Sequence, residues 1–212
     1  LTAQTTYYYW VRANCGGGDT STWVAGGSFS TPCNATDVPY VQDFESVTVP
    51  AIPVCGLLQN AGTGNNWVTS SNPGSGFTSK TLQYTYNSSS AANAWYFTQG
   101  INLTGGTSYA ISYKYGNNST TYVEKLKVAY GNSPINSAMT TQLFDHTSIV
   151  SGVPATNSVT FTPATTGVYY FGFNAYSDAD QFYLFVDDIS VLIPCSSANA
   201  GTISSVISSS CP

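Results

Sequence analysis

Apolar and polar residues alternate with a period of two along most of the chain, which is the period of a β-strand with one buried face. The stretch SYAISYKYG shows it most clearly. Tyr109, Ile111 and Tyr113 fall on one face of the predicted strand, while Ser112 and Lys114 fall on the other. We therefore expect a strand here whose tyrosine face packs in a core.

The same period continues in neighbouring stretches. In VEKLKVAYG, Leu126, Val128 and Tyr130 alternate with Lys125 and Lys127. The stretches NSVTFTP, GVYYFGFNAYS and QFYLFVDDISV are also short and rich in aromatic and β-branched residues, and turn residues separate them. No helical period is present. Many short strands at close spacing predict an all-β fold, a jelly-roll β-sandwich.

Residues 1–33 form a unit of their own. The runs TTYYYWVRANC and TWVAGGSFST predict two strands, and GGGDTS between them predicts the turn. Two strands bury too little surface to be stable alone. We interpret this segment as the closing part of a sandwich domain, whose missing strands a neighbouring chain could add.

Two similar boundaries, STPC and LIPC, enclose the main domain. Residues 34–195 are predicted to be one jelly roll, and the Ser-rich residues 196–212 a linker or the start of a further Ig-like module. The five cysteines are an odd number, which indicates disulfides in an oxidising compartment with at least one partner elsewhere. We expect Cys33–Cys55, with Cys33–Cys195 as the alternative. We expect Cys211 to pair with a cysteine beyond the end of this sequence or with Cys195.

Charged residues make up only 7% of the chain, against roughly 25% in an average globular protein. Solubility must come from Ser, Thr, Asn, Gly and Tyr, which is typical of an extracellular all-β protein. The five Lys and Arg form no basic patch, so nucleic acid is not an expected partner. No apolar run approaches the roughly 20 residues of a bilayer-spanning helix, so we expect no membrane span.

Two adjacent carboxylates interrupt the apolar run QFYLFVDDISV. Asp187 is expected to share the inward face with Ile189 and Val191. Asp43 and Glu45 lie near the other end of the domain, and the first and last strands of a jelly roll commonly lie side by side. Clustered carboxylates repel one another unless a cation joins them.

Oxygen ligands without His or Cys favour a hard cation, and Ca²⁺ suits an extracellular protein. The predicted metal site is therefore Asp43, Glu45, Asp187 and Asp188. The alternative is a solvated acidic edge that binds no metal.

Residues for catalysis are scarce. His146 is the only histidine and is interpreted as a polar loop residue, since no nucleophile accompanies it. Glu124 precedes Lys125 and Lys127 and is interpreted as an ordinary charge at a strand end. We therefore expect no enzyme activity from this chain.

Aromatic side chains offer a second kind of site. Tyr84, Tyr86 and Tyr122 are candidate ligand-binding residues, because aromatic faces pack on the apolar faces of pyranose rings. The alternative is that these rings fill or flank the core. For Trp67 and Trp95 the core is the favoured interpretation.

Two resemblances follow from these motifs. The pattern T-x-Y-x-x-x-V-R-A-x-C, followed by S-x-W and F-x-T, resembles the closing strands of fibronectin type III modules in secreted bacterial proteins. The motifs PYVQDFES, NNW and FYLFVDDISV occur in that order and resemble MAM-like jelly rolls, including cleaved-adhesin domains and related cell-surface domains of Bacteroidota. That family often carries a structural calcium, which the resemblance places at Asp43, Glu45, Asp187 and Asp188.

The resemblance implies a non-catalytic adhesion module of a large, multi-domain bacterial cell-surface protein. Its expected ligand is carbohydrate or another surface polymer. Two alternatives remain open. One is an accessory binding module of a secreted hydrolase, and the other is a structural spacer or filament subunit that self-associates by strand addition.

Overall fold

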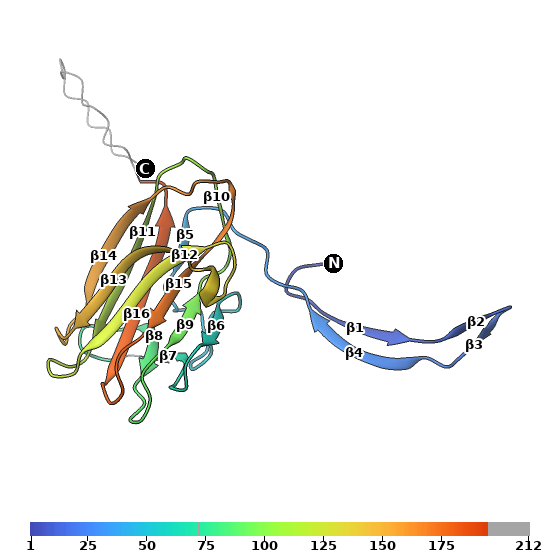
Figure 1. Ribbon diagram of the computed structural model, residues 1–212, viewed down its shortest axis with the longest axis horizontal. Coiled ribbons are helices and arrows are strands. Elements are labelled where there is room, and N and C mark those ends of the chain that lie inside the picture. Colours follow the sequence, from blue (N-terminus) through green and yellow to red (C-terminus); the bar gives the residue numbers. More distant parts are fainter. Residues whose placement is uncertain (72, 195–212) are drawn as a thin grey trace, which may run out of the picture.

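The computed structural model describes residues 1–71 and 73–194, and the expected linker at 196–212, with Cys195 and Cys211, lies outside them. The described chain folds into two packed β-sheets with a separate hairpin at the N-terminus (Figure 1). The all-β jelly-roll sandwich predicted from the alternation is confirmed. Within the described residues, no helix has the length and apolar character needed to cross a membrane.

The first sheet, called sheet I, has five strands in a row and a sixth beside β15. Across the sheet these are β13 (Thr141–Ile149), β12 (Glu124–Gly131), β15 (Gly167–Ala175), β9 (Ala94–Phe97) and β6 (Leu57–Asn60), with β10 (Ile101–Leu103) pairing β15. A short 3₁₀ helix (Asn136–Ala138) lies in the connection from β12 to β13.

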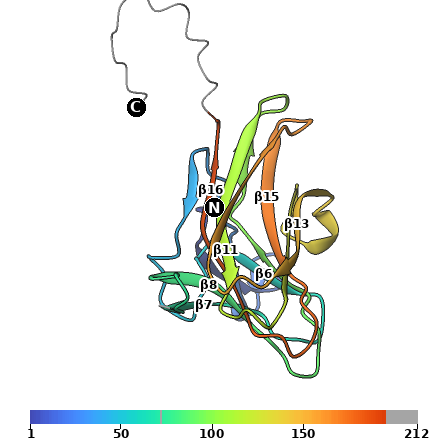
Figure 2. The same ribbon diagram turned by 90° about the vertical axis from the view of Figure 1, so that its left-hand side faces the viewer.

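The second sheet, sheet II, faces sheet I in the sandwich (Figure 2). Across it lie β14 (Ala155–Phe161), β11 (Tyr109–Asn117), β16 (Tyr183–Leu192), β8 (Lys80–Thr85) and β7 (Trp67–Ser71), with β5 (Tyr40–Gln42) also pairing β16. The first and last strands of the domain are thus antiparallel neighbours, with Tyr40 opposite Val191, as the jelly-roll prediction required.

The core lies between the two sheets and contains the faces that the alternation predicted. Tyr109, Ile111 and Tyr113 of β11 are buried there, as are Leu126 and Val128 of β12. Trp67 is also part of this core. Burial of such large side chains is the main favourable term in the stability of the sandwich.

Trp95 is buried as well, but on the opposite face of its strand. Its neighbours Ala94 and Tyr96 belong to the core between the sheets, so Trp95 lies on the outer face of sheet I, stacked on Phe97 at 5.8 Å between ring centroids. The prediction that Trp95 is buried is confirmed, although strand alternation directs it to the outer face of sheet I rather than into the space between the sheets.

The N-terminal hairpin projects away from the sandwich (Figure 1). It pairs β1 (Thr6–Val11) with β4 (Val24–Ser30), and the short strands β2 (Asn14–Gly16) and β3 (Asp19–Thr20) extend it to its tip. The two strands and the glycine turn expected from the sequence are all present. Gly16, Gly17 and Gly18 have positive φ angles, which glycine adopts without strain.

A disulfide joins Cys33 to Cys55 at the base of the hairpin. The expected pairing of Cys33 with Cys55 is thereby confirmed. It closes a loop that contains β5 and the segment with Asp43 and Glu45, while Cys15 is an exposed free thiol.

Candidate functional site

A β-bulge in β16, the last strand, determines on which face of sheet II Asp187 and Asp188 lie. On β16, Asp188 and Ile189 together face a single residue of β11, because Ser190 pairs with Ser112 and Asp187 pairs with Lys114. Asp188 has a φ of 48°, the left-handed conformation found in some bulges. The bulge shifts the alternation by one residue.

Asp187 therefore lies on the outer face of sheet II with Lys114. The expectation that it shares the inward face with Ile189 and Val191 is wrong, because that argument assumed an uninterrupted period of two. Asp187 is nonetheless only 2% exposed. Segments outside the sheet cover this region, including Phe77, whose ring lies 5.2 Å from that of Phe185 and 5.1 Å from Lys114 Nζ.

The Asp187 carboxylate has few partners for a buried group. Oδ1 accepts a hydrogen bond of 2.9 Å from the backbone N–H of Asp188, and no ion pair to Asp187 forms among the described residues. Burial raises the pKa of Asp187 to about 7. The hydrogen bond and the positive charge of Lys114 lower this pKa, whereas the negative charges of Asp188 and Glu45 raise it further.

Asp43 and Glu45 lie in the turn that follows β5. Asp43 Oδ1 accepts a hydrogen bond of 3.1 Å from the N–H of Glu45, and Glu45 Oε1 accepts one of 2.9 Å from the N–H of Lys80. This turn lies close enough to β16 for the charge of Glu45 to act on Asp187. Asp43, Glu45 and Asp188 are exposed.

The four predicted metal ligands thus do not form one compact cluster. In the part of the chain that the structure describes, no group of three or more His, Cys, Asp or Glu side chains is arranged to hold a metal ion. What the structure brings together is one buried carboxylate, Asp187, and one exposed carboxylate, Glu45.

The three candidate tyrosines separate into two environments. Tyr84 is in the core, with its ring edge-on to Trp67 at 5.9 Å, so it cannot contact a ligand at the surface. The prediction that Tyr84 is a ligand-binding residue is therefore wrong. Tyr84 lies within β8 on the inner face, whereas Tyr86 lies just beyond the end of that strand.

Tyr86 and Tyr122 both lie beside Phe182. The ring centroid of Phe182 is 6.0 Å from that of Tyr86 and 5.6 Å from that of Tyr122, and each of the two tyrosine planes makes an angle of less than 30° with the plane of Phe182. Tyr183 completes the group, 4.5 Å from Phe182. Tyr122 is 42% exposed and the other three are half-buried. We call Tyr86, Tyr122, Phe182 and Tyr183 the aromatic cluster.

Side-chain amides hold the loops that present this cluster. Asn117 Nδ2 donates to the carbonyl oxygens of Ser119 and Tyr122, and Asn65 Nδ2 donates to those of Thr85 and Tyr86. These bonds restrain the backbone on both sides of the cluster. The rings are thereby ordered before any ligand binds, which lowers the entropic cost of binding.

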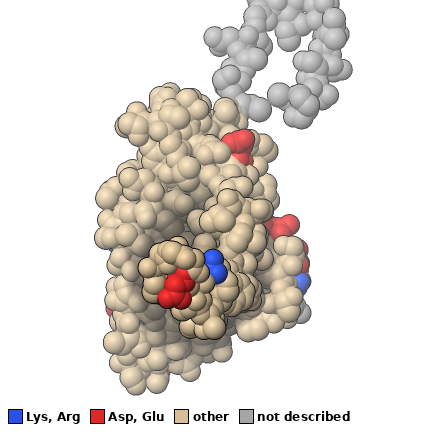
Figure 3. All heavy atoms as spheres, turned by 90° about the vertical axis from the view of Figure 1, so that its right-hand side faces the viewer, with Lys and Arg blue, Asp and Glu red and all other residues tan. Residues whose placement is uncertain are grey.

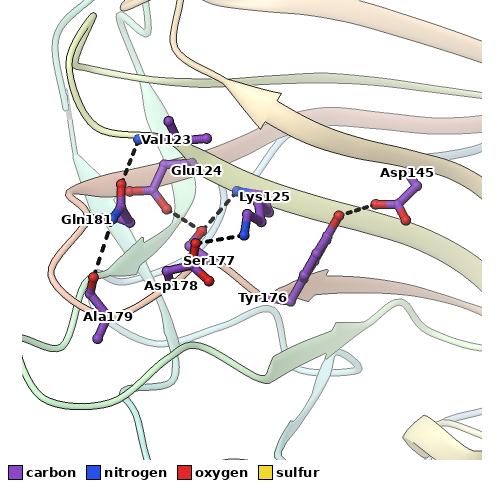
Figure 4. A network of polar contacts seen from close by, with 9 residues as sticks. All are labelled: Val123, Glu124, Lys125, Asp145, Tyr176, Ser177, Asp178, Ala179 and Gln181. Carbon is purple, nitrogen blue, oxygen red and sulfur yellow. Dashed lines mark hydrogen bonds and ion pairs between the residues drawn. The ribbon is translucent and has the colours of Figure 1, made fainter.

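A buried carboxylate, that of Glu124, anchors the backbone of the loop that carries Phe182, and its hydrogen bond from Ser177 is drawn in Figure 4. Glu124 is fully buried, its Oε1 accepts a 2.6 Å hydrogen bond from the N–H of Phe182, and its Oε2 accepts one from Ser177 Oγ. Burial raises the pKa of Glu124, and these two hydrogen bonds lower it. The interpretation of Glu124 as an ordinary charge at a strand end is wrong. Glu124 is the first residue of β12, but it is buried on the face opposite to that of Lys125 and Lys127.

The remaining charged groups near Glu124 pair with one another (Figure 4). Lys125 Nζ forms an ion pair of 2.7 Å with Asp178 Oδ2, and Tyr176 Oη donates a hydrogen bond to Asp145. These groups belong to the side of sheet I that faces solvent. They leave the aromatic cluster without a charged member.

His146 lies in β13 and is buried, so its interpretation as a loop residue is wrong. Its Nε2 is 2.8 Å from Tyr113 Oη, and its ring lies 3.8 Å from that of Tyr115. Burial lowers the pKa of His146 to about 4. A neutral imidazole that is packed between aromatic rings is a structural group.

Phe182 and Tyr183 are the members of the cluster that sequence reasoning missed. They belong to the run QFYLFVDDISV, which the sequence pattern assigns to a strand without indicating that its first rings reach the surface. The available signal was their position at the start of that run, directly after the polar turn SDADQ, where a ring more often reaches the surface.

Comparison with solved structures identifies the fold. The K1 cleaved adhesin domain of Lys-gingipain from Porphyromonas gingivalis matches with a TM-score of 0.61 and 18% identity, covering 74% of this chain and 99% of that domain. The K3 domain from the same organism gives 0.56 and 20%, covering 72% of this chain and 97% of that one. The K2 domain gives 0.58 and 19%, covering 73% and 99%.

The expected resemblance to cleaved-adhesin domains is thereby confirmed at the level of the fold. No family model matches the chain, and a search of curated proteins found no match. Identity this low shows the architecture of the jelly roll, and function has to be argued from the sites themselves.

Proposed function

We propose that this chain is a non-catalytic, extracellular binding module that recognises a neutral carbohydrate at the aromatic cluster. The observation that carries the proposal is the convergence of Tyr86, Tyr122, Phe182 and Tyr183 at one end of the sandwich, on loops restrained by side-chain amides. Aromatic rings supply rigid, amphipathic surface at a low cost in conformational entropy.

The chemistry of the surroundings supports a sugar as the ligand. The cluster has no charged member, and hydroxyl and amide side chains dominate the segments NSSSAAN and GNNSTT beside it, while the turn before Phe182 adds Asp180 and Asp178, of which Asp178 is paired with Lys125. A pyranose ring offers an apolar face for stacking and hydroxyl groups for hydrogen bonds. A hydrophobic peptide would leave most of these polar groups unpaired, which is unfavourable.

Affinity electrophoresis in gels that contain neutral polysaccharides (a soluble β-glucan, xylan or galactan) tests the proposal. We expect at least one of them to retard the protein, and Tyr122→Ala and Phe182→Ala to weaken binding at least tenfold. Phe144→Ala, at an exposed aromatic position of β13, is the matched control and should bind normally. The proposal fails if no polymer binds, or if Tyr122→Ala binds like the natural chain.

We also propose a structural Ca²⁺ near Asp187. The residues present fit a calcium ion in part. Their donor atoms are oxygens, and the buried carboxylate of Asp187 is repelled by the charges of Asp188 and Glu45, which a cation would offset. Asp187 and Glu45 would hold the ion, with Asp43 and Asp188 beside them. When bound, the ion would supply positive charge that joins the turn after β5 to β16.

The extracellular, bacterial cell-surface setting belongs to the same proposal. The Cys33–Cys55 disulfide and the adhesin-like fold support it. So do the aromatic and amide-rich surface and the low content of charge. An accessory module attached to a secreted hydrolase would use the same sugar site, with the catalysis located in another domain.

A structural spacer or filament subunit is the second candidate function, and the N-terminal hairpin favours it. In our proposal residues 1–33 are the closing strands of a fibronectin type III-like module. Their apolar side chains are exposed on both faces of a two-stranded sheet, so the hairpin is suited to contact a further sheet rather than a small ligand.

A further inference from the structure

A cavity of about 460 Å³ lies between β5 and the segment of chain that leads to β6. None of the residues that line it is charged. The polar part of the lining includes Tyr40, Gln42 and Gln99, and the apolar part includes Val47, Ile52 and Pro53. Cys55 also lines the cavity, and its disulfide to Cys33 ties this wall in place. A cavity of this volume is large enough for a small ligand.

The cavity is separate from the aromatic cluster. Tyr40 pairs with Val191 near the end of β16, whereas Tyr183 of the aromatic cluster is the first residue of that strand. At about 3.3 Å per residue, the two positions lie roughly 25 Å apart. β6 lies on the right-hand side of the sandwich in Figure 1, and in Figure 3, which shows that side, charged atoms are few. The surroundings therefore favour an uncharged ligand.

A buried hydroxyl beside the cavity lacks a partner. Tyr96 is fully buried, and its Oη has no hydrogen-bond partner in the part of the chain that the structure describes. Gly56 and Pro53 line the cavity at this point. A Cβ atom at Gly56 would lie 3.2 Å from Tyr96 Oη and 2.7 Å from the ring, so only glycine allows this close approach. A hydroxyl that loses water on folding and gains no protein partner is unfavourable.

Tyr40 connects this hydroxyl to the cavity. Tyr40 lines the cavity, and it lies close enough to Tyr96 for each phenol to affect the pKa of the other. Burial raises the pKa of Tyr40 to about 12, while Tyr96, Gln42 and the backbone of Gln99 lower it. A phenol donates one proton and can also accept. When Tyr40 donates to a ligand oxygen, its own oxygen can accept from Tyr96, so one ligand group provides for both hydroxyls.

Two side-chain amides in the lining are each anchored through one atom. Gln42 Oε1 accepts a hydrogen bond of 2.8 Å from the N–H of Phe44, and Gln99 Nε2 donates one of 2.7 Å to the carbonyl oxygen of Asn34. Gln42 therefore retains its Nε2 as a donor, and Gln99 retains its Oε1 as an acceptor. Together with Tyr40, the lining offers a donor, an acceptor and a group that can do both.

We propose that this cavity is a second binding site, which takes a single neutral pyranose residue such as the end of a polysaccharide chain. Adjacent hydroxyls of a pyranose present donors and acceptors side by side, which matches Tyr40 and the two amides. Its apolar C–H face can pack on Val47 and Ile52. The site is independent of the aromatic cluster, because no residue of that cluster lines the cavity.

An amide NMR titration of the isotope-labelled chain tests the site, with glucose, galactose, mannose, xylose, arabinose and N-acetylglucosamine as probes. We expect at least one of them to shift the N–H signals of Gly56 and Gln99. Glucuronate should bind more weakly than its neutral counterpart glucose, because the cavity has no basic side chain to pair with a carboxylate. Tyr40→Phe removes only the hydroxyl and should raise the dissociation constant about tenfold.

Tyr84→Phe is the matched control. The Tyr84 hydroxyl is also buried without a partner among the described residues, but it lies beside Trp67 and outside the cavity lining, so this variant should bind like the natural chain. The proposal is overturned if no sugar shifts Gly56 or Gln99 at tens of millimolar, if glucuronate binds as tightly as glucose, or if Tyr84→Phe weakens binding as much as Tyr40→Phe. Shifts confined to Tyr122 and Phe182 would also overturn it, while supporting the aromatic cluster as the sugar site.

Discussion

Glu124 and Asp187 are both carboxylates removed from solvent, yet the protein treats them differently. Glu124 is fully buried and accepts hydrogen bonds from Ser177 Oγ and from the N–H of Phe182. Asp187 is buried to nearly the same degree, but it accepts one hydrogen bond, from its own neighbour Asp188, and lies close to further negative charge.

The difference shows how two groups with the same chemistry can have different roles. At Glu124 the fold itself provides the donors, so the carboxylate organises the loop that carries Phe182. At Asp187 the fold compensates burial only in part, through the N–H of Asp188 and the charge of Lys114 on β11, and burial still raises the pKa to about 7, so a proton or a cation would favour the folded state. Four measurements on carboxylates separate these roles.

The largest effect is expected for Glu124→Ala. This change leaves the N–H of Phe182 and the hydroxyl of Ser177 without a buried acceptor, and each such loss costs about 1–3 kcal/mol. We expect a loss of roughly 3–5 kcal/mol in the free energy of unfolding, measured by urea denaturation followed by tryptophan fluorescence.

Glu124→Gln is the matched variant for this measurement. Its amide oxygen can still accept from Phe182, and the Ser177 hydroxyl can rotate to accept from the amide nitrogen, so the loss should stay near 1 kcal/mol. If Glu124→Ala unfolds at the same urea concentration as the natural chain, Glu124 does not hold the loop.

The second effect concerns metal at Asp187. An ion that binds only the folded state stabilises it by about 3 kcal/mol when free Ca²⁺ is a hundredfold above its dissociation constant. For a domain of this size that corresponds to roughly 6–12 °C in melting temperature. We expect a chelator to lower the melting temperature by that amount, measured by calorimetry, and added Ca²⁺ to restore it.

Asp187→Asn should remove this response to Ca²⁺, because the neutral amide lacks the charge that attracts the ion. In chelator the same variant should melt at a higher temperature than the natural chain, since burial of the charge is no longer required. Identical melting curves with and without chelator for the natural chain would refute the metal site and leave Asp187 as a protonated structural group.

The third effect is the pH dependence in chelator. The pKa of Asp187 is raised from 3.8 to about 7 in the folded chain, so between pH 4 and 7 the folded state holds a proton that the unfolded state has lost. Stability due to this group is therefore greatest below pH 4 and decreases as pH rises toward 7.

We expect the melting temperature of the natural chain to fall by a few degrees relative to Asp187→Asn as pH rises from 4 to 7. The comparison with Asp187→Asn cancels the contributions of the other carboxylates. Ca²⁺ should remove the difference in slope, because the ion favours the ionised form. Parallel curves for the two proteins in chelator would show that Asp187 is not shifted.

The smallest effect is expected for an exposed carboxylate. Asp178 pairs with Lys125, but its side chain is 70% exposed, and ion pairs in such positions contribute less than about 1 kcal/mol. Asp178→Asn should change the melting temperature by no more than about 2 °C, with or without Ca²⁺. A larger change would mean that the ion pair, rather than burial, governs this end of the sandwich.

Most of the fold was predictable because strand alternation is a strong signal. The inward faces of β11 and β12 follow directly from the positions of Tyr109, Ile111, Leu126 and Val128. The adjacency of β5 and β16 was also predictable, from the general order of a jelly roll.

The candidate site was less predictable, because it depends on features that break the alternation. The bulge at Asp188 reverses the face of Asp187, and a period of two cannot reveal an inserted residue. The end of β8 at Thr85 separates Tyr84 from Tyr86 although their spacing suggests a common face. The burial of Glu124 depends on Ser177 and Phe182, more than fifty residues away in the chain.

The Cys33–Cys55 bond also determines how the domain would respond to mechanical tension. A pull applied at residues 32 and 194 passes from Cys33 through the disulfide to Cys55 and continues along β6, so the loop between the two cysteines carries none of the load. That loop contains β5 and the turn with Asp43 and Glu45. A pull from the N-terminal side therefore does not load β5, and tension reaches the pairs between β5 and β16 only through β16 itself.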